Sequence, residues 1–573
     1  MSESPNIQRS DLLPYRADYH PVLGQLMKEL GFPDVINDIV ESPNSQAVID
    51  AGTFVALFIH HMLGDMNIKM YRMHEFFQDK ALPLLIPWNP NIDLAEINDD
   101  RAGRVLDAIW NANPQKVFST VVDFAIRSHS LETDVIHGDT TSKSFQGAYD
   151  DQIEEIGIPF ITQGCSKDHR PDLKQLVFGV GTTNDGVPLI GEITNGNESD
   201  MTLNGRWVKK LRTMLQKDPD DFLLYIADSS LVTTDNLRLR HQENIDIISR
   251  LPGRFGLEGE LKRKALANNS WEDIGKISPE KNAAFYRYLN TTGCIDGRDY
   301  RFVVVHSDSK DKRKLKSLDK SVRKEHKKGS GALKDLTKRP FVCQRDAEIE
   351  AERFLKESSL KYHDIDWNIE SREEKVKRKK RGRPKKGDII PTKTRYYLSG
   401  SLRINEENYT FERELCGLFV LITTLMDIEE YPAGRILREY KGQMNVERIF
   451  KFIKNPAWVG SFCLKTPERI AALGYVLLMA AVIYTLWERR VRKALSKEGV
   501  KPIRGLNQQK TKKPTAYALQ TVLSGILVQS QKSDNELTMW LPKPLNINQK
   551  RVVEFSGYSE EIYHGEWRIN KKI

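Results

Sequence analysis

The chain has 573 residues, and this length predicts several folded units, because single hydrophobic cores stop growing at roughly 250–300 residues. Lysine and arginine outnumber aspartate and glutamate, and the resulting formal net charge of +9 suits a polyanionic partner. Five scattered cysteines form no CxxC pair or His/Cys cluster, which argues against a disulfide framework or structural zinc and favours a reducing compartment.

Residues 1–130 are expected to form a helical domain. The opening MSESPNIQRSDLL contains no apolar stretch of the kind that a secretory signal requires. Residues 20–32 and 51–64 have helical patterns, and Asn98 or Asp99 is placed to cap a third helix. Such a domain could bind DNA ends or serve for dimerisation or packing, and both interpretations stay open because no clear helix-turn-helix motif occurs.

From residue 131 to 255 the pattern changes to short strands. Three β-rich runs (DVIHGDTTSKSFQG, QLVFGVGTT and VPLIGEIT) come first, with a hairpin turn over 183–186 between the last two. A helix capped by Asp200 or Thr202 follows, and then LLYIAD, a continuous apolar run typical of a central parallel strand. This order is that of the first part of a ribonuclease H-like core.

Residues 256–425 interrupt that order with a polar, highly charged stretch. Strand-like runs (YRFVVVHS, RYYLSGSLRI and GLFVLITT) occur at intervals, and a long lysine-rich helix is expected over 310–328. We therefore predict an α/β chain with a ribonuclease H-like core that a β-rich insertion interrupts, preceded by the helical domain. Residues 426–500 complete the core, and residues 501–573, rich in Lys, Gln and Asn, are expected to form a loosely ordered C-terminal tail.

Residues 470–487 (IAALGYVLLMAAVIYTLW) carry no charge over a length near the minimum for spanning a bilayer. They follow directly after a helix expected around Glu447. A helix between a sheet and other helices can be apolar on all sides. We interpret the segment as a buried core helix, with a membrane span as the alternative.

Three acidic residues stand in distinctive settings. Asp139 lies in DVIHGDTTSKSF and Asp228 ends LLYIAD, so both are expected at the ends of buried strands, where open α/β sheets place ligands. Glu447 lies within a predicted amphipathic helix. An aspartate in an apolar strand is unfavourable to bury alone, and a cation would remove that cost; capping of a loop or helix is the structural alternative.

Carboxylates from two strands and one helix form an oxygen-ligand site suited to Mg²⁺ or Mn²⁺. Two-metal sites of this kind break and join phosphodiesters. In a basic chain, this combination indicates an enzyme that acts on DNA.

The helix around Glu447 carries a further pattern. At about 100° per residue, a continuous helix places Tyr440, Gln443, Glu447 and Lys454 in a stripe roughly 60° wide. An ordinary solvated face is the alternative interpretation. The spacing is that of the Y-x2-R-x3-E-x6-K signature, and the chain resembles the branch of bacterial insertion-sequence DDE transposases that carries it.

The resemblance covers about residues 130–490. The HGDTTS and IADSS settings resemble the family's two aspartate motifs, and the long gap before Glu447 resembles its β-rich insertion. By this resemblance, Asp139, Asp228 and Glu447 are the catalytic residues and hold two divalent ions, Mg²⁺ or Mn²⁺. One ion activates water or a DNA 3′-hydroxyl, and the other stabilises the leaving oxygen. His137 is a candidate to support the ligands, with a structural role preferred.

The same resemblance assigns DNA-binding positions. Tyr440 and Lys454 would contact phosphates of the element's terminal strand, with Gln443 at the position where the family has arginine. Glutamine still donates hydrogen bonds but lacks the charge and the bidentate fork of arginine. Arg448 or Lys441 could compensate, although neither lies on the stripe.

A dense basic run over 375–386 holds nine Lys or Arg in twelve residues. Within it, Arg381 and Arg383 flank a glycine and precede a proline, as in the core of an AT-hook. Such a segment can enter the narrow minor groove of A·T-rich DNA. Non-specific contact with DNA and a solvated, self-repelling linker are the alternatives.

The sequence as a whole predicts a DNA transposase that cleaves the ends of a mobile element and joins them to target DNA. Its partners would be terminal inverted repeats and target DNA, with a homodimer in the complex, in the bacterial cytoplasm at the nucleoid and with no membrane. A catalytically impaired DNA-binding relative is one alternative, favoured by Gln443. Another two-metal nuclease is the second, and the spacing of Tyr440 and Lys454 argues against it.

Overall fold

The computed structural model divides the chain into two compact units, Met1–Arg250 with Cys294–Tyr300 and Thr423–Ile573, and Leu251–Gly293 with Arg301–Ile422. The described residues are 12–41, 49–64, 72–145, 147, 149, 152, 154–278, 282–376, 391–454, 464, 466–533 and 536–568. Arg381 and Arg383, like most of the basic run, lie outside the described residues.

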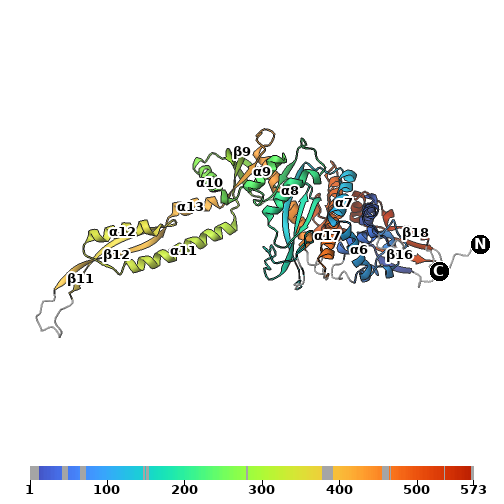
Figure 1. The fold of residues 1–573 in the computed structure, drawn as a ribbon, viewed down its shortest axis with the longest axis horizontal. Helices are drawn as coiled ribbons and strands as arrows, with labels where there is room; N and C mark the ends of the chain where they lie inside the picture. Colours follow the sequence, from blue (N-terminus) through green and yellow to red (C-terminus); the bar gives the residue numbers. More distant parts are fainter. Residues whose placement is uncertain are drawn as a thin grey trace, which may run out of the picture. The chain divides into compact units, whose positions relative to one another are not determined.

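A mixed sheet forms the centre of the first unit, in the order β4-β3-β2-β5-β6 (Figure 1). Strands β2 (Val135–Phe145), β3 (Lys174–Thr182) and β4 (Pro188–Thr194) are antiparallel, whereas β5 (Leu224–Ile226) runs parallel to both β2 and β6 (Asp246–Arg250). The three β-rich runs and the apolar run before Asp228 therefore form strands as predicted. The hairpin turn after β3 is also confirmed, and Gly186 adopts φ 85°, which favours glycine.

Two helices follow β4 and β5 as the sequence predicts, α8 (Asp200–Met214) and α9 (Thr234–Gln242). Ser199 caps α8 by accepting the Thr202 backbone N–H, so the helix begins one residue earlier than a cap at Asp200 requires. Thr233 caps α9 in the same way through Asn236.

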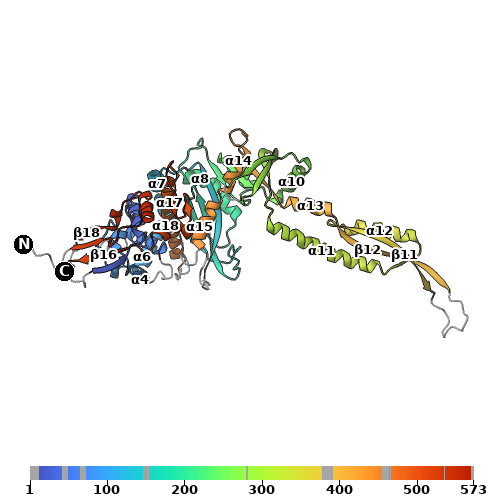
Figure 2. The ribbon, with the colours of Figure 1, turned by 180° about the vertical axis from the view of Figure 1, so that it is seen from behind.

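Helix α17 (Pro467–Ser496) contains the apolar segment and is covered by α3, α6, α7, α15, α18 and strand β4 (Figures 1 and 2). Among the described residues, α17 is the one helix that is long and apolar enough to cross a membrane. Of its most apolar 18-residue stretch, 94% is buried within the protein. Gly191 of β4 would meet Leu478 at 2.6 Å if it carried a Cβ, and Gly474 of α17 would meet Ile193 at 2.5 Å. These two glycines let the helix and the strand approach closely, as a core helix requires.

The N-terminal region is largely helical, as expected. Its helices are α1 (His20–Glu29), α2 (Phe32–Asn37), α3 (Ala51–Met62), α4 (Met73–Phe77), α5 (Leu82–Leu85), α6 (Asp99–Asn111) and α7 (Pro114–His129). Of the two candidate caps, Asn98 is the one used, since its side chain accepts the Arg101 backbone N–H. One strand, β1 (Leu12–Arg16), precedes these helices and was not predicted.

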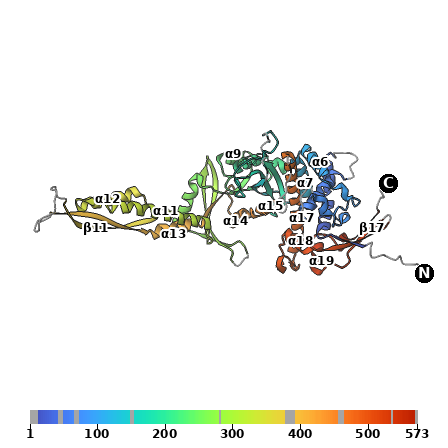
Figure 3. The ribbon, with the colours of Figure 1, turned by 90° about the horizontal axis from the view of Figure 1, so that it is seen from below.

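The expectation of a loosely ordered C-terminal tail is wrong. The region folds into α18 (Ala516–Leu523), β16 (Leu527–Lys532), β17 (Glu536–Trp540), α19 (Ile547–Phe555) and β18 (Gly565–Arg568), seen in Figure 3. Strands β1, β16, β17 and β18 form a four-stranded antiparallel sheet in that order, so the strand at the start of the chain pairs with β16. A few apolar residues in this polar stretch, among them Val528 and Tyr563, are fully buried and account for the fold.

The second unit spans nearly the region expected as an insertion, 256–425. It contains β7 (Glu272–Lys276), β10 (Pro340–Phe341), β11 (His363–Lys375) and β12 (Thr392–Ile404), together with most of β8 (Phe285–Ile295), β9 (Arg298–Ser307) and β13 (Leu418–Thr423). Its helices are α10 (Leu257–Asn268), α11 (Lys312–Leu336), α12 (Gln344–Ser358) and α13 (Glu406–Leu415). The unit is therefore mixed α/β and not predominantly β. Helices α11 and α12 both pack on β12 (Figure 3).

Two buried histidines couple the N-terminal helices to one another. The Nδ1 atoms of His20 and His60 are 3.1 Å apart, and Nε2 of His60 lies 3.0 Å from the Leu85 carbonyl oxygen. Because that carbonyl can only accept, His60 donates from Nε2, and its Nδ1 accepts from His20. Burial lowers the pKa of His60 to about 4 and holds that of His20 well below its usual range, so both are neutral in the folded protein.

We expect stability to fall with acidification. The folded protein resists protonation of His60 until about pH 4, whereas the unfolded chain takes up the proton near pH 6.5, so this stability is complete above pH 6.5 and is lost between pH 6.5 and 4. The loss should be roughly 2 kcal/mol for His60 between pH 7 and pH 5. Urea midpoints at the two pH values check this. His60→Gln should reduce the difference, and an unchanged difference would contradict the assignment.

Candidate active site

Asp139 and Asp228 emerge at the same end of two neighbouring parallel strands. Strand β2 pairs with β5 only over Val135–His137, with His137 opposite Ile226. Asp139 is two residues beyond His137 and Asp228 two residues beyond Ile226. The prediction that they come from strand ends is right for Asp228. It is wrong for Asp139, which lies in the middle of β2, because that strand continues in its hairpin with β3.

The electrostatics of Asp139 are unusual for a carboxyl group. Its pKa is raised to about 7, mainly by burial, and the negative charges of Asp228 and Asp200 contribute to the increase. The ammonium of Lys167 and the backbone N–H of Thr140 act in the opposite direction. Asp139 therefore lies in a position where a cation would favour its charged form.

Asp228 is held in place by the turn that follows it. Its Oδ1 accepts the Ser230 backbone N–H at 2.9 Å and also accepts the Ser230 hydroxyl. Its own carbonyl accepts the Ser249 hydroxyl at 2.7 Å. These contacts leave Oδ2 without a hydrogen bond from the described residues near it, so one oxygen can face a ligand.

The helix expected over the signature positions is broken in two. Helix α14 (Ala433–Lys441) carries Tyr440, α15 (Met444–Lys454) carries Glu447 in its first turn, and Gln443 lies in the turn between them. The continuous stripe predicted from a single helix is therefore wrong. A Cβ on Gly442 would come within 2.6 Å of the His137 ring, so the turn passes a buried histidine where only glycine fits.

The hairpin turn after β3 fixes the start of α15. His137 contacts the Asn184 side-chain oxygen through Nε2 at 2.5 Å, and Asn445 donates to the Asn184 carbonyl at 2.6 Å. Helix α15 also packs on β2, the strand that carries Asp139. His137 thus has the structural role preferred from the sequence, and it helps to position the helix that holds Glu447.

Tyr440 connects the three acids electrostatically. Burial raises the pKa of its hydroxyl, the Arg250 guanidinium acts in the opposite direction, and the charges of Asp228, Asp139 and Glu447 all raise it. The hydroxyl therefore lies within electrostatic reach of all three carboxylates. As the side chains are placed, no three His, Cys, Asp or Glu residues in the described part of the chain form a group that could hold a metal ion.

The remaining signature residues have different surroundings. Lys454 Nζ contacts Asp168 Oδ1 at 2.6 Å, and the buried amide nitrogen of Gln443 has no hydrogen-bond partner among the described residues. Sequence reasoning missed Lys167 and Asp168, which lie on the loop between β2 and β3. Nothing in their local pattern marks them, because their importance comes from contacts with distant residues.

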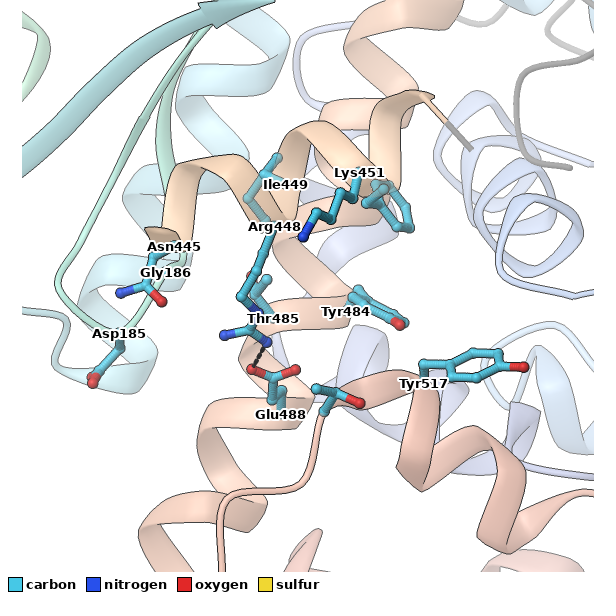
Figure 4. Close-up of a pocket in the computed structure, with 12 residues that line it drawn as sticks. Asp185, Gly186, Asn445, Arg448, Ile449, Lys451, Tyr484, Thr485, Glu488 and Tyr517 are labelled. Atoms are coloured by element: carbon cyan, nitrogen blue, oxygen red, sulfur yellow. Dashed lines mark hydrogen bonds and ion pairs between the residues drawn. The ribbon is translucent and has the colours of Figure 1, made fainter. Parts of the chain in front are cut away.

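Arg448 does not replace the family's arginine. Its guanidinium is paired with Glu488 of α17 (Figure 4). Glu488 also pairs with Arg492 at 2.8 Å and accepts the Ala516 backbone N–H at 2.7 Å. A cavity of about 270 Å³ adjoins this pair and is lined by residues of α15, α17 and α18, among them Lys451 and Tyr517. Glu488 thereby ties the helix that carries Glu447 to the core.

Two family models match the chain. A transposase DDE domain matches residues 180–483, more than half of the chain, and a domain of unknown function matches residues 14–123. The chain therefore belongs to the transposase DDE-domain family and is a DDE-type transposase, an enzyme of DNA transposition. The match includes Asp228 and Glu447, whereas Asp139 precedes it.

No curated protein matches the sequence. Among solved structures, a piggyBac transposase synaptic complex with hairpin DNA is similar at a TM-score of 0.35 and 10% sequence identity, over 88% of this chain and 79% of that one. This TM-score is too low to define a shared fold. Membership of the DDE family implies dependence on a divalent metal ion.

Proposed function

We propose that the chain cleaves DNA at the ends of a mobile element and transfers those ends into target DNA, with Asp139, Asp228 and Glu447 as its catalytic carboxylates. The proposal rests on the observation that all three carboxylates act electrostatically on the Tyr440 hydroxyl. They do so from two neighbouring parallel strands and from a helix that packs on one of these strands. The match to a transposase DDE domain supports the reaction class.

The fold proposed for the core is that of ribonuclease H. The sheet order β4-β3-β2-β5-β6, with an antiparallel meander followed by two parallel strands, supports this assignment. So does the position of Asp139 and Asp228 beyond the paired ends of β2 and β5, where open α/β sheets bind ligands. The second unit would then be the insertion between Asp228 and Glu447.

Asp139, Asp228 and Glu447 would hold two divalent ions, Mg²⁺ or Mn²⁺. The donor chemistry fits, because carboxylate oxygens are the ligands that these ions prefer, and a cation would lower the raised pKa of Asp139. When bound, such ions supply an activated water or 3′-hydroxyl and stabilise the leaving oxygen.

The protein's own groups have separate tasks in this scheme. Ser230 orients the Asp228 carboxylate, and the raised pKa of Tyr440 keeps its hydroxyl protonated, so that it can donate to a phosphate oxygen. Gln443 brings an amide nitrogen with no partner among the described residues, which can donate to the same strand. Lys454 would contact a phosphate after leaving Asp168.

The proposed partners are the terminal inverted repeats of the element and target DNA, held by a homodimer. Arg381 and Arg383 would add minor-groove contacts to A·T-rich DNA. The proposed location is the bacterial cytoplasm, at the nucleoid.

The test is cleavage of DNA that carries the sequences flanking the gene. We expect nicks at the element ends with Mg²⁺ or Mn²⁺ and none with EDTA, on a duplex with the flanking repeats but not on a scrambled one. Equal cleavage of both duplexes would indicate another two-metal nuclease. Selective binding without cleavage would indicate a catalytically impaired relative, and cleavage in EDTA would remove the metal from the proposal.

A further inference from the structure

The loop between β2 and β3 lies along the part of β2 that extends past its pairing with β5. The Lys167 backbone N–H donates to the Ser142 hydroxyl at 2.9 Å, and the Ser144 hydroxyl donates to Asp168 Oδ2 at 3.3 Å. These two contacts fix the Lys167-Asp168 pair beside the strand that carries Asp139.

Lys167 reaches toward the active site. Its Nζ donates to the Thr140 carbonyl at 2.8 Å and to the Thr140 hydroxyl at 2.5 Å, and it pairs with Asp200 at 3.0 Å. Thr140 follows Asp139 directly, and Lys167 is among the charges that act on Asp139. With 33% of its side chain exposed, Lys167 is also open to a ligand from solvent.

Two more lysines lie around Asp168. Lys454, at the end of α15, contacts it at 2.6 Å, and the side chains of both residues are about one-quarter exposed. Lys143 of β2 is buried and interacts electrostatically with both Asp168 and Lys454. Because strand side chains alternate between faces, Lys143 shares a face with Asp139, roughly 13 Å further along the strand.

Outside the proposed catalytic carboxylates, three lysines share two carboxylates. Lys167 pairs with Asp200 and Lys454 pairs with Asp168, and Lys143 interacts electrostatically with the same Asp168. Lys167 and Lys454 are partly exposed and form a cationic surface beside β2, to which the buried Lys143 adds a further positive charge. A polyanionic strand is the ligand that such a surface would bind.

We propose that Lys167 and Lys454 hold backbone phosphates of the DNA strand that leads into the active site, that the buried Lys143 adds to their positive potential, and that Asp168 pairs with Lys454 when DNA is absent. The inference rests on the proposed function. Lys143 is too far along β2 from Asp139 to touch the reacting phosphate. It is a positioning residue for neighbouring phosphates, and its loss affects affinity more than turnover.

A merely structural salt bridge between the loop and α15 makes the opposite prediction for Asp168. If the carboxylate only fastens the two segments, Asp168→Asn weakens the protein and its DNA binding together. If it competes with phosphate, the same change frees Lys454, and DNA binding tightens. The sign of the change in affinity therefore separates the two roles.

The experiment measures binding of a fluorescent duplex with the element end, without divalent metal, over a range of salt concentrations. Asp168→Asn should tighten binding about two- to fivefold, the value of one partly exposed ion pair. Lys143→Met and Lys167→Gln should each weaken binding and reduce the salt slope by about 1. With Mg²⁺, the loss in the Lys143 variant should appear mainly as a higher DNA concentration for half-maximal cleavage.

Two controls match these variants. Asp172→Asn removes an exposed carboxylate that pairs with Arg170 in the same loop, and Lys209→Met removes an exposed lysine on α8. Both should leave affinity and salt slope near those of the wild type.

Weaker binding by Asp168→Asn would overturn the proposed competition. A salt slope for the lysine variants equal to that of Lys209→Met would overturn the phosphate-binding surface, and Lys167→Gln decides this even where Lys143→Met fails to fold. If the wild-type protein itself binds the element end no better than a scrambled duplex, the proposed function fails first.

Discussion

Replacing any one of the three proposed catalytic carboxylates by its amide should reduce strand cleavage at least about a thousandfold while DNA binding persists. The variants are Asp139→Asn, Asp228→Asn and Glu447→Gln. Each keeps the shape of the side chain and removes the charge that a divalent ion requires. Nicking of end-containing duplex with Mg²⁺ measures the loss, and gel shift of the same duplex measures binding.

Asp139→Asn has a second expected effect, on stability. Folding raises the pKa of this carboxyl to about 7. At any pH above the pKa of the unfolded chain, its ionisation therefore disfavours the folded state. The neutral amide removes that penalty, and the variant should be at least as stable as the wild type at pH 8 without metal. Lower stability would show that the charged form is needed for folding.

Asp235→Asn is the matched control for these variants, because Asp235 is 89% exposed on α9, the helix after Asp228. It should cleave as the wild type does. Near-normal cleavage by any one of the three amide variants would remove that residue from the site.

The central sheet could be predicted because its strands carry their own signals. The run before Asp228 is continuously apolar, as a strand flanked on both sides by parallel neighbours must be, and the turn over 183–186 has hairpin chemistry. The two aspartates follow from the same patterns, since each interrupts or ends such a run.

The break between α14 and α15 could not be predicted from periodicity. The apolar pattern continues through Gly442, and a glycine inside a helical pattern is often tolerated. The turn after α14 passes close to His137, which lies about 300 residues earlier in the sequence, and this approach is not visible in the local pattern. The folded C-terminal region could not be predicted for the same reason, because its strand β16 pairs with β1 near the opposite end of the chain.

Helix α17 shows a related limit. Its composition alone fits both a core helix and a membrane span, and only the elements packed around it distinguish the two. Lys167 and Asp168 were missed for a similar reason, because a loop gives no periodic signal and their contacts are with β2, α8 and α15.

Glu488→Leu should lower the free energy of unfolding by about 1–3 kcal/mol, the expected cost of leaving partly buried donors without their acceptor. The Glu488 side chain is 3% exposed and receives Arg448 from α15, Arg492 from its own helix and the Ala516 backbone N–H at the start of α18. Leucine fills the space but leaves all three donors without their acceptor. Urea unfolding measures the change, with Glu498→Leu, exposed beyond the end of α17, as control.

The Arg448→Met/Glu488→Leu double variant shows whether the loss of stability comes from the missing ion pair or from an arginine left without a partner. If most of the loss comes from leaving Arg448 without its partner, removing that charge as well should recover part of it, and the double variant should be more stable than Glu488→Leu alone. Cleavage should follow the same order, because Arg448 and Glu447 are neighbours on α15 and a displaced helix moves both. Losses that simply add in the double variant would show that the two side chains act independently and would contradict the proposed coupling.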